Sequence, residues 1–121
     1  MNIKDCIFCK IIDKTSPADI VFEDKYILAL KSIEPISNGH TLVIPKIHCE
    51  NIFDIENDIL EKLISVSKKL SKELCELNNA TGVNLLNASG IDAQQSIFHF
   101  HLHIVPRYPD DKLDLWFRSG L

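Results

Sequence analysis

The sequence lacks a basic run, and it lacks an apolar stretch long enough to cross a membrane. Its 121 residues carry a formal net charge of −4. A protein that grips DNA or RNA independently of sequence needs a basic stripe, so we expect no nucleic-acid polymer as partner. A membrane helix needs about 20 consecutive apolar residues, which excludes a transmembrane protein. The first ten residues lack the apolar stretch and small-residue cleavage site of a signal peptide, so we expect a cytoplasmic protein.

Internal repeats, low-complexity tracts and linkers are also missing, and the length suits one domain, so we predict a single domain over residues 1–121.

Cysteine is scarce, at four residues: Cys6, Cys9, Cys49 and Cys75. Without a secretion signal, the close pair Cys6 and Cys9 indicates a metal or redox site rather than a disulfide. The chain has no second Cys-x-x-Cys motif that could supply further metal ligands.

Hydrophobic periodicity predicts a short helix, five strands and one long helix. Residues 55–78 repeat leucine and isoleucine at helical spacing with lysine and glutamate between them, and Asp54 is placed to cap the start of this helix. The expected elements are a helical turn at 7–12, strands at 20–24, 25–32, 40–45, 82–87 and 97–105, and the helix at 55–78. This order predicts an α+β domain in which a five-stranded antiparallel sheet packs against the long helix.

The last predicted strand contains the stretch HFHLHIVPR, in which histidine occupies every second position. Side chains two residues apart on a strand share a face, so His99, His101 and His103 line one face together. One histidine on a strand is usually solvated or hydrogen-bonded, but three on one face gain nothing from packing and repel one another when protonated. The pattern therefore predicts a functional cluster: a metal site, an anion site or a catalytic site.

The two other histidines flank the strand at 40–45. Paired residues on antiparallel neighbours have a nearly constant sum of residue numbers. The pairs His40 with His103 and His48 with His99 have similar sums, and a break near Pro45 would absorb the difference. We therefore predict that the strands at 40–45 and 97–105 are neighbours, with each of these histidine pairs in proximity.

This pairing divides the histidines between two sites. Cys6, Cys9, His48 and His99 would complete a closed Cys₂His₂ set, which suits one structural zinc ion per chain. The alternatives for the cysteines are two buried small residues or a redox pair. His101 then remains as a nucleophile toward phosphorus, because imidazole can form a nucleotidyl intermediate that is later hydrolysed. His103 and His40 would hold phosphate oxygens, and Ser96 would offer a hydroxyl to the leaving group or to the phosphate.

These residues resemble the histidine triad (HIT) family, closest to its Hint-like branch, over nearly the whole chain. CIFCKII is similar to the family's N-terminal segment, NGHTLVIPKIH to its third-strand motif, and QSIFHFHLHIVPR to the triad itself. The resemblance implies a HIT-like fold, a homodimer with one sheet extended across the interface, and nucleotide binding. The implied activity is hydrolysis at the α-phosphorus of a nucleoside monophosphate derivative, typically an adenosine phosphoramidate.

The resemblance also assigns roles to individual residues. His101 matches the nucleophile; His103, His40 and Ser96 match the groups around the phosphate; His99 matches a zinc ligand, with Cys6, Cys9 and His48 as its partners. The substrate-binding positions fall on Phe8, Leu30, Ser32, Ile33, Asn87 and Gln95. In Hint-like dimers the C-terminal residues approach the neighbouring active site, so Trp116 would either do this or cover the dimer surface with Leu115 and Phe117.

The sequence departs from the family pattern at three positions. Ser32 stands where the family often has an acidic residue that binds the ribose hydroxyls, and a serine cannot accept from both hydroxyls with charge assistance. Gln94 replaces a glycine, and Asn87 matches its family counterpart only with an offset of one residue, Ala88 being the strict match. The alternatives are therefore a dinucleoside polyphosphate hydrolase, or a zinc-stabilised nucleotide-binding regulatory module with little turnover.

Overall fold

The computed structural model describes residues 3–117 and has the predicted α+β architecture. Short 3₁₀ turns lie at Ile3–Asp5 and Ile91–Ala93. The helices and strands are α1 (Ile7–Ile12), β1 (Ile20–Glu23), β2 (Ile27–Lys31), β3 (Thr41–Pro45), α2 (Asn57–Asn78), β4 (Gly82–Leu86) and β5 (Leu102–Arg107). Among these residues, no helix combines the length and the apolar character needed to span a membrane.

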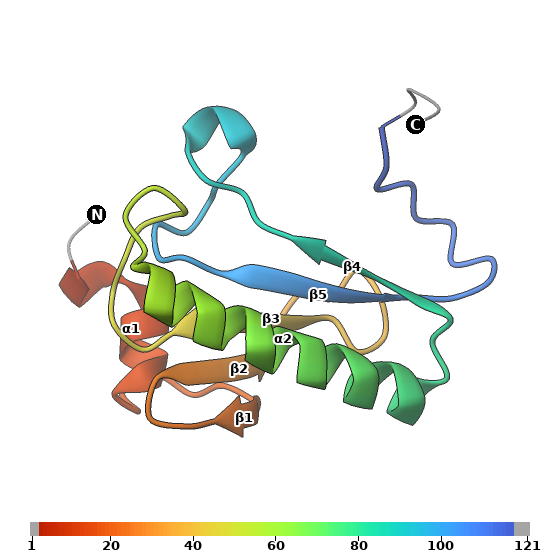
Figure 1. Cartoon of the computed structure of the whole chain (residues 1–121), viewed down its shortest axis with the longest axis horizontal. Coiled ribbons are helices and arrows are strands. Elements are labelled where there is room, and N and C mark those ends of the chain that lie inside the picture. Colours follow the sequence, from red (N-terminus) through yellow and green to blue (C-terminus); the bar gives the residue numbers. More distant parts are fainter. Residues whose placement is uncertain (1–2, 118–121) are drawn as a thin grey trace.

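The five strands form one antiparallel sheet in the order β1-β2-β3-β5-β4 (Figure 1). The predicted proximity of the third and fifth strands is confirmed, because Leu42 of β3 lies opposite His103 of β5. His40 directly precedes β3, so this register brings it beside His103. The fold therefore places residues from the middle and the end of the chain in one site.

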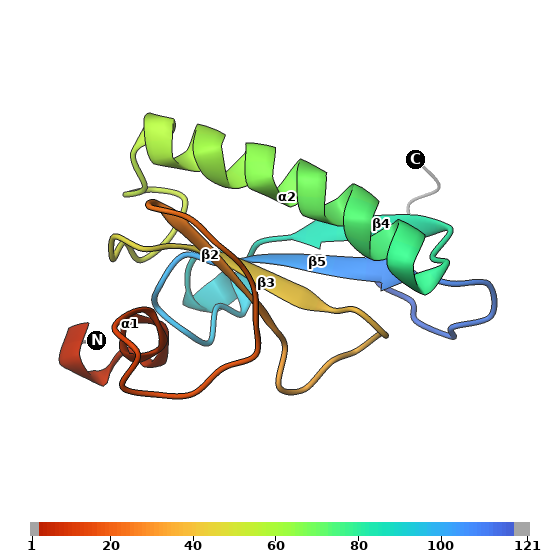
Figure 2. The ribbon, with the colours of Figure 1, turned by 90° about the horizontal axis from the view of Figure 1, so that it is seen from below.

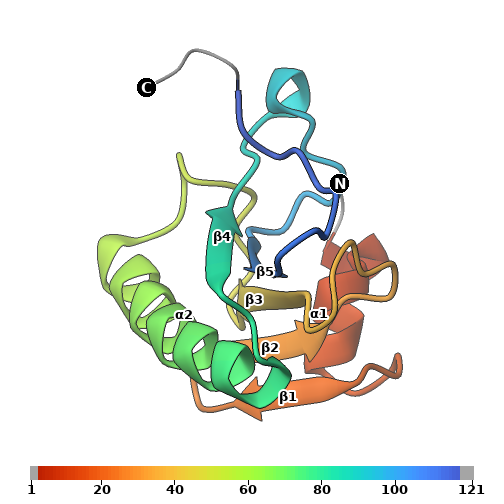
Figure 3. The same cartoon turned by 90° about the vertical axis from the view of Figure 1, so that its right-hand side faces the viewer.

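Both faces of the central strands are covered. Helix α2 packs on one face of the sheet and α1 lies on the other, as Figures 2 and 3 show. In β2, Ile27 and Ala29 join the core beneath α2, while Leu28 and Leu30 join a second core with Phe8 of α1. Since strands covered on both faces carry continuous apolar runs, the sequence of β2 and β3 is apolar at nearly every position.

The fifth strand begins later than predicted, at Leu102 rather than residue 97, and it ends at Arg107 rather than 105. Its pairing with β3 stops where Val43 lies opposite Leu102, although β3 itself continues to Pro45, and the Pro45 carbonyl is bound by the His99 side chain instead. Residues 97–101 therefore lack a continuous partner strand and form one backbone bond to that side, from the Phe100 N–H to the Cys49 carbonyl. His99 and His101 consequently precede the regular strand, although the alternation of faces is kept.

The long helix begins at Asn57, two residues after the predicted start, with Glu56 in the N-cap position. Asp54 does not cap it. Its carboxylate accepts hydrogen bonds from the backbone N–H groups of Glu50 and Asn51, and so closes the turn before the helix. An aspartate can cap either feature, and local sequence alone does not separate the two.

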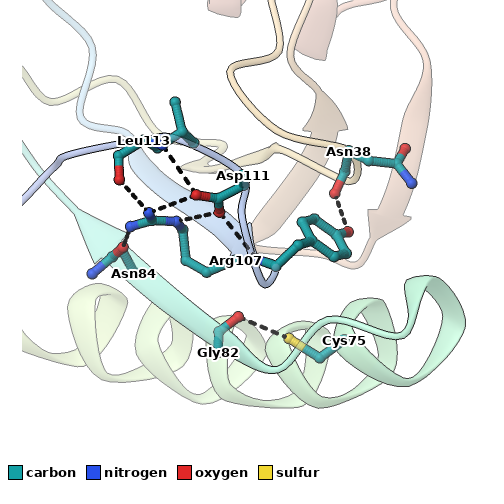
Figure 4. A network of polar contacts seen from close by, with 8 residues as sticks. Asn38, Cys75, Gly82, Asn84, Arg107, Asp111 and Leu113 are labelled. Atoms are coloured by element: carbon teal, nitrogen blue, oxygen red, sulfur yellow. Dashed lines mark hydrogen bonds and ion pairs between the residues drawn. The ribbon is translucent and has the colours of Figure 1, made fainter.

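Arg107 at the end of β5 anchors the C-terminal segment (Figure 4). Its guanidinium binds both carboxylate oxygens of Asp111, at 2.8 and 3.0 Å, and also donates to the Asn84 side chain and the Leu113 carbonyl. Asp111 accepts two further bonds from backbone N–H groups. This clamp fixes the direction in which the chain leaves the sheet. Beyond it, Trp116 and Phe117 stack on each other, and both are more than half exposed.

Candidate active site and metal centre

Four potential metal ligands converge at the start of α1. Cys6 caps this helix and Cys9 lies one turn later, while His48 follows β3 and His99 precedes β5. The Nδ1 atom of His99 lies 3.3 Å from the Cys6 Sγ, 3.6 Å from the Cys9 Sγ and 3.2 Å from the His48 Nδ1. All four donor atoms lie within 4.8 Å of one another. The structure therefore brings together the Cys₂His₂ set expected from the sequence.

The spacing and protonation of these atoms fit a tetrahedral ion. Zinc–sulfur bonds of about 2.3 Å and zinc–nitrogen bonds of about 2.0 Å give tetrahedral edges of roughly 3.3–3.8 Å, close to the separations observed here. The Nε2 of His99 lies 2.8 Å from the Pro45 carbonyl oxygen, which can only accept. The ring proton is therefore on Nε2, and the Nδ1 lone pair faces the other three ligands, as metal-bound histidines require.

The electrostatics of the cluster point the same way. Burial raises the pKa of the Cys9 thiol to about 12, and the neighbouring Cys6 adds to this shift. Burial also lowers the pKa of His99 to about 4, which keeps the ring neutral. A neutral imidazole is ready to bind a cation, and a bound cation would supply the charge that the buried thiolates need.

His101 is held in one orientation by its own backbone. Its Nδ1 lies 2.9 Å from the carbonyl oxygen of His99, so this nitrogen carries the proton and donates it. The Nε2 then holds the lone pair and is the nitrogen available for chemistry. Burial lowers the pKa of His101, which keeps that lone pair unprotonated. The ring packs edge-on against Phe8, with centroids 5.3 Å apart.

A chain of hydrogen bonds fixes the tautomers of His40 and His103. The backbone N–H of Ile36 donates to the His40 Nδ1 at 3.1 Å, so the proton of neutral His40 is on Nε2. That Nε2 lies 2.9 Å from the His103 Nδ1 and donates to it, which leaves the proton of His103 on its own Nε2. Burial lowers the pKa of His103 to about 4. His103 is therefore a neutral donor beside His101, with ring centroids 5.1 Å apart.

The rings of His101 and His103 line a cavity of about 500 Å³ on the α1 side of the sheet. Eight of the predicted site residues border it: Phe8, Leu30, Ser32, Ile33, His40, Ser96, His101 and His103. Its remaining wall is mostly aliphatic, from Ile7, Ile11, Ile36, Leu42, Leu86, Ile97 and Val105, with Glu34 as the one acidic side chain. The cavity thus combines an apolar surface with a few convergent polar groups, which is the usual composition of a small-molecule site.

Asn87 and Gln95 are placed differently from the other predicted substrate-binding residues. Neither is among the residues that line the cavity. Asn87 donates to the carbonyl of His101 at 3.0 Å, and the buried Gln95 amide binds the backbone of Glu50, Ile97 and Gly90. Both side chains support the loop around the histidines, and their contact with substrate stays a prediction.

Sequence reasoning missed Glu34 and the aliphatic side chains of the cavity wall. Strand periodicity could have supplied one of them, because Leu42 pairs with His103 and so lies beside the predicted catalytic face. Glu34 follows Ser32 closely, and the absence of an acidic residue at position 32 was itself a reason to examine the next carboxylate. Gln94 adopts a left-handed φ of 70°, which explains why a glycine suits this position.

The chain thus combines an α+β fold, an apolar cavity that His101 and His103 border, and a Cys₂His₂ cluster beside that cavity. A model of the HIT domain matches residues 13–110. The chain therefore belongs to the HIT domain family. A HIT-like protein of Borreliella burgdorferi is 43% identical over 109 residues, covering 88% of this chain and 78% of the relative. The adenylylsulfatase HINT3 of Arabidopsis thaliana is 36% identical over 109 residues, which cover 90% of this chain and 55% of the relative.

Solved structures agree with this assignment. A zinc-bound histidine triad family protein from Mycobacterium smegmatis superposes with a TM-score of 0.89 at 34% identity, covering 98% of this chain and 86% of the other. A HIT family hydrolase from Legionella pneumophila superposes with a TM-score of 0.74 at 37% identity, covering 84% of this chain and 91% of the other.

Proposed function

We propose that the protein is a nucleotide-binding hydrolase that acts at the α-phosphorus of nucleoside monophosphate derivatives of the adenosine phosphoramidate type. The observation that carries this proposal is the tautomer of His101, because its Nδ1–H is bound to the His99 carbonyl and its Nε2 lone pair remains available in the cavity. The adenylylsulfatase and the HIT family hydrolase among the relatives are consistent with this activity.

The reaction proceeds in two displacements. In the first, the His101 Nε2 forms a bond to phosphorus while the phosphorus–nitrogen bond to the amine breaks, and the amine leaves after taking a proton from the Ser96 hydroxyl or from water. The His103 Nε2–H donates to a phosphate oxygen and stabilises its charge. In the second, water attacks phosphorus while the bond from phosphorus to the His101 Nε2 breaks, and the proton that water loses returns to the Ser96 oxygen or to the solvent that supplied it. The nucleoside monophosphate leaves and His101 is again neutral.

The charge of the cavity favours a phosphoramidate over a dinucleoside polyphosphate. No lysine or arginine is among its lining residues, and burial keeps His101 and His103 neutral. A polyphosphate chain carries several negative charges that such a cavity cannot neutralise, whereas a monosubstituted phosphoramidate carries one. The neutral donors present suit the smaller charge.

We further propose one structural zinc ion per chain, held by Cys6, Cys9, His48 and His99. When bound, the ion supplies a cross-link and no chemistry to the substrate, because four protein ligands leave no open position. Its residues join α1 to the ends of β3 and β5. They also fix His99, whose carbonyl orients His101.

We also propose a cytoplasmic homodimer that extends the sheet through β4. This strand lies at one edge of the sheet, and its Val83 and Leu85 are partly exposed. The opposite edge, β1, has an irregular register between Ile20 and Phe22, a feature that discourages pairing. Sedimentation of the wild type and of Leu85→Lys tests this, with a dimer and a monomer expected. A monomeric wild type would contradict it.

The second candidate is a nucleotide-binding regulatory module with little turnover. The observation that favours it is Ser32, which lines the cavity at a position where a carboxylate would bind the ribose more strongly. Acid quenching during turnover, followed by mass spectrometry, separates the two. The hydrolase should carry one nucleotidyl group on the peptide that contains His101, and His101→Asn should carry none. Asparagine is a suitable replacement because its amide can still donate to the His99 carbonyl. A wild type that never accumulates this adduct and releases no product would support the module.

A further inference from the structure

Glu34 is the only acidic side chain that borders the catalytic cavity, and it has no partner in the part of the chain that the structure describes. The lining residues include no lysine or arginine that could neutralise it. Its carboxylate forms no hydrogen bond or ion pair within residues 3–117. A carboxylate at the edge of a ligand cavity, with its hydrogen-bonding capacity unused, is available to a ligand.

The loop that carries Glu34 is held at both ends by His40. The backbone N–H of Ser32 donates to the His40 carbonyl at 3.0 Å, and the N–H of Ile36 donates to the His40 Nδ1 at 3.1 Å. Pro35 restricts the backbone between them. Since His40 also binds His103, the backbone that carries Glu34 is anchored to the proposed phosphate site before any ligand arrives, and the exposed side chain extends from that anchored backbone.

The chemistry of a carboxylate decides which part of a nucleotide it can contact. An ionised carboxylate only accepts hydrogen bonds, so it repels the phosphate and needs a donor. The ribose is attached directly to the phosphate and carries two neighbouring hydroxyl groups, which match the two oxygens of one carboxylate. The base, which is attached to C1′ on the far side of the sugar from the phosphate, is better placed against the apolar wall that includes Phe8 and Leu30.

We propose that the Glu34 carboxylate accepts hydrogen bonds from the 2′- and 3′-hydroxyl groups of the ribose, and so makes the cavity selective for ribonucleotides. Glu34 thus supplies, two residues further along the loop, the charged acceptor that the neutral hydroxyl of Ser32 cannot provide. This inference rests on the proposed function, because it assumes that a nucleotide occupies the cavity.

Calorimetric titration of the purified full chain with AMP and with 2′-deoxy-AMP tests the proposal. The variants are Glu34→Gln and, as a matched control, Glu61→Gln on the exposed face of α2, on the opposite side of the sheet. Both glutamates are exposed, so neither change should disturb folding. Losing bonds to a charged acceptor should weaken AMP binding about tenfold or more in Glu34→Gln. Because 2′-deoxy-AMP keeps the 3′-hydroxyl, the same variant should weaken its binding by a smaller factor than it weakens the binding of AMP, and Glu61→Gln should match the wild type for both ligands.

The outcomes separate this inference from the function beneath it. If AMP and 2′-deoxy-AMP bind the wild type equally, or if Glu34→Gln weakens both ligands equally, the role of Glu34 is wrong while nucleotide binding stands. If AMP does not bind the wild type at all, the proposed function fails and this inference fails with it.

Discussion

Replacing His99 by alanine should destabilise the protein through the metal centre, although His99 belongs to the same histidine triplet as the nucleophile. The change removes one of four ligands, and the chain should lose its zinc. It also leaves the Pro45 carbonyl without its buried donor, which costs about 1–3 kcal/mol. The edge-on contact with the Phe8 ring, at 5.6 Å between centroids, contributes about 0.5–1.5 kcal/mol more.

The metal-independent part of this loss is therefore about 1.5–4.5 kcal/mol. For a domain of this size, roughly 4 °C of melting temperature corresponds to each kcal/mol, so His99→Ala should melt about 6–18 °C below the metal-free wild type. The double variant Cys6→Ser with Cys9→Ser serves as the control, because it removes two ligands and keeps the His99–Pro45 bond. It should melt close to the metal-free wild type.

Thermal denaturation with and without a chelator, combined with metal analysis, measures both parts. The wild type should contain about one zinc per chain and should melt at a lower temperature once the metal is removed. The two variants should contain no zinc and should not respond to chelator. Full zinc content in the cysteine double variant, or a wild-type melting temperature that chelator does not change, would refute the proposed ligand set.

Two further predictions concern the hydrogen-bond networks. His40→Ala removes the donor that fixes the His103 tautomer, so kcat should fall about 100-fold or more in the fraction that is folded, and an unchanged kcat would contradict the relay. The change also leaves the Ile36 N–H without its acceptor, so a moderate loss of stability should accompany it. The pKa of Asp111 is held well below its usual range by Arg107, so this carboxylate stabilises the fold above the unfolded-state pKa, near 4, and the benefit disappears as pH falls below that value. In denaturant titrations, Asp111→Asn should therefore have a lower free energy of unfolding at pH 7, and this free energy should fall less than that of the wild type as the pH is lowered. A fall with acid equal to that of the wild type would contradict this role of Asp111.

Much of the fold followed from periodicity. The alternation at His99, His101 and His103 predicted that one face serves chemistry, and the structure places Phe100, Leu102 and Ile104 in the core on the other face. The similar residue-number sums predicted the adjacency of β3 and β5, because antiparallel register is a local geometric constraint. The convergence of Cys6, Cys9, His48 and His99 followed from this adjacency and from the number of ligands that zinc prefers.

What the sequence did not determine depends on contacts between distant backbone groups. The start of β5 depends on where its pairing with β3 stops, at Val43 opposite Leu102, and the side-chain pattern is the same inside or outside a strand. The supporting roles of Asn87 and Gln95 arise from bonds to carbonyl groups that have no sequence signature. The place of Glu34 in the cavity depends on how His40 holds its loop.

The most direct test of the central claim is a turnover assay with adenosine phosphoramidate and a diadenosine polyphosphate side by side, using wild type and His101→Asn at equal zinc content. We predict that the wild type hydrolyses the phosphoramidate faster than the polyphosphate, and that the variant binds AMP but turns over neither substrate. Undiminished turnover by His101→Asn would contradict the assignment of His101 as the nucleophile. A folded, zinc-loaded wild type that hydrolyses neither substrate would contradict the assignment of the protein as a hydrolase of this type.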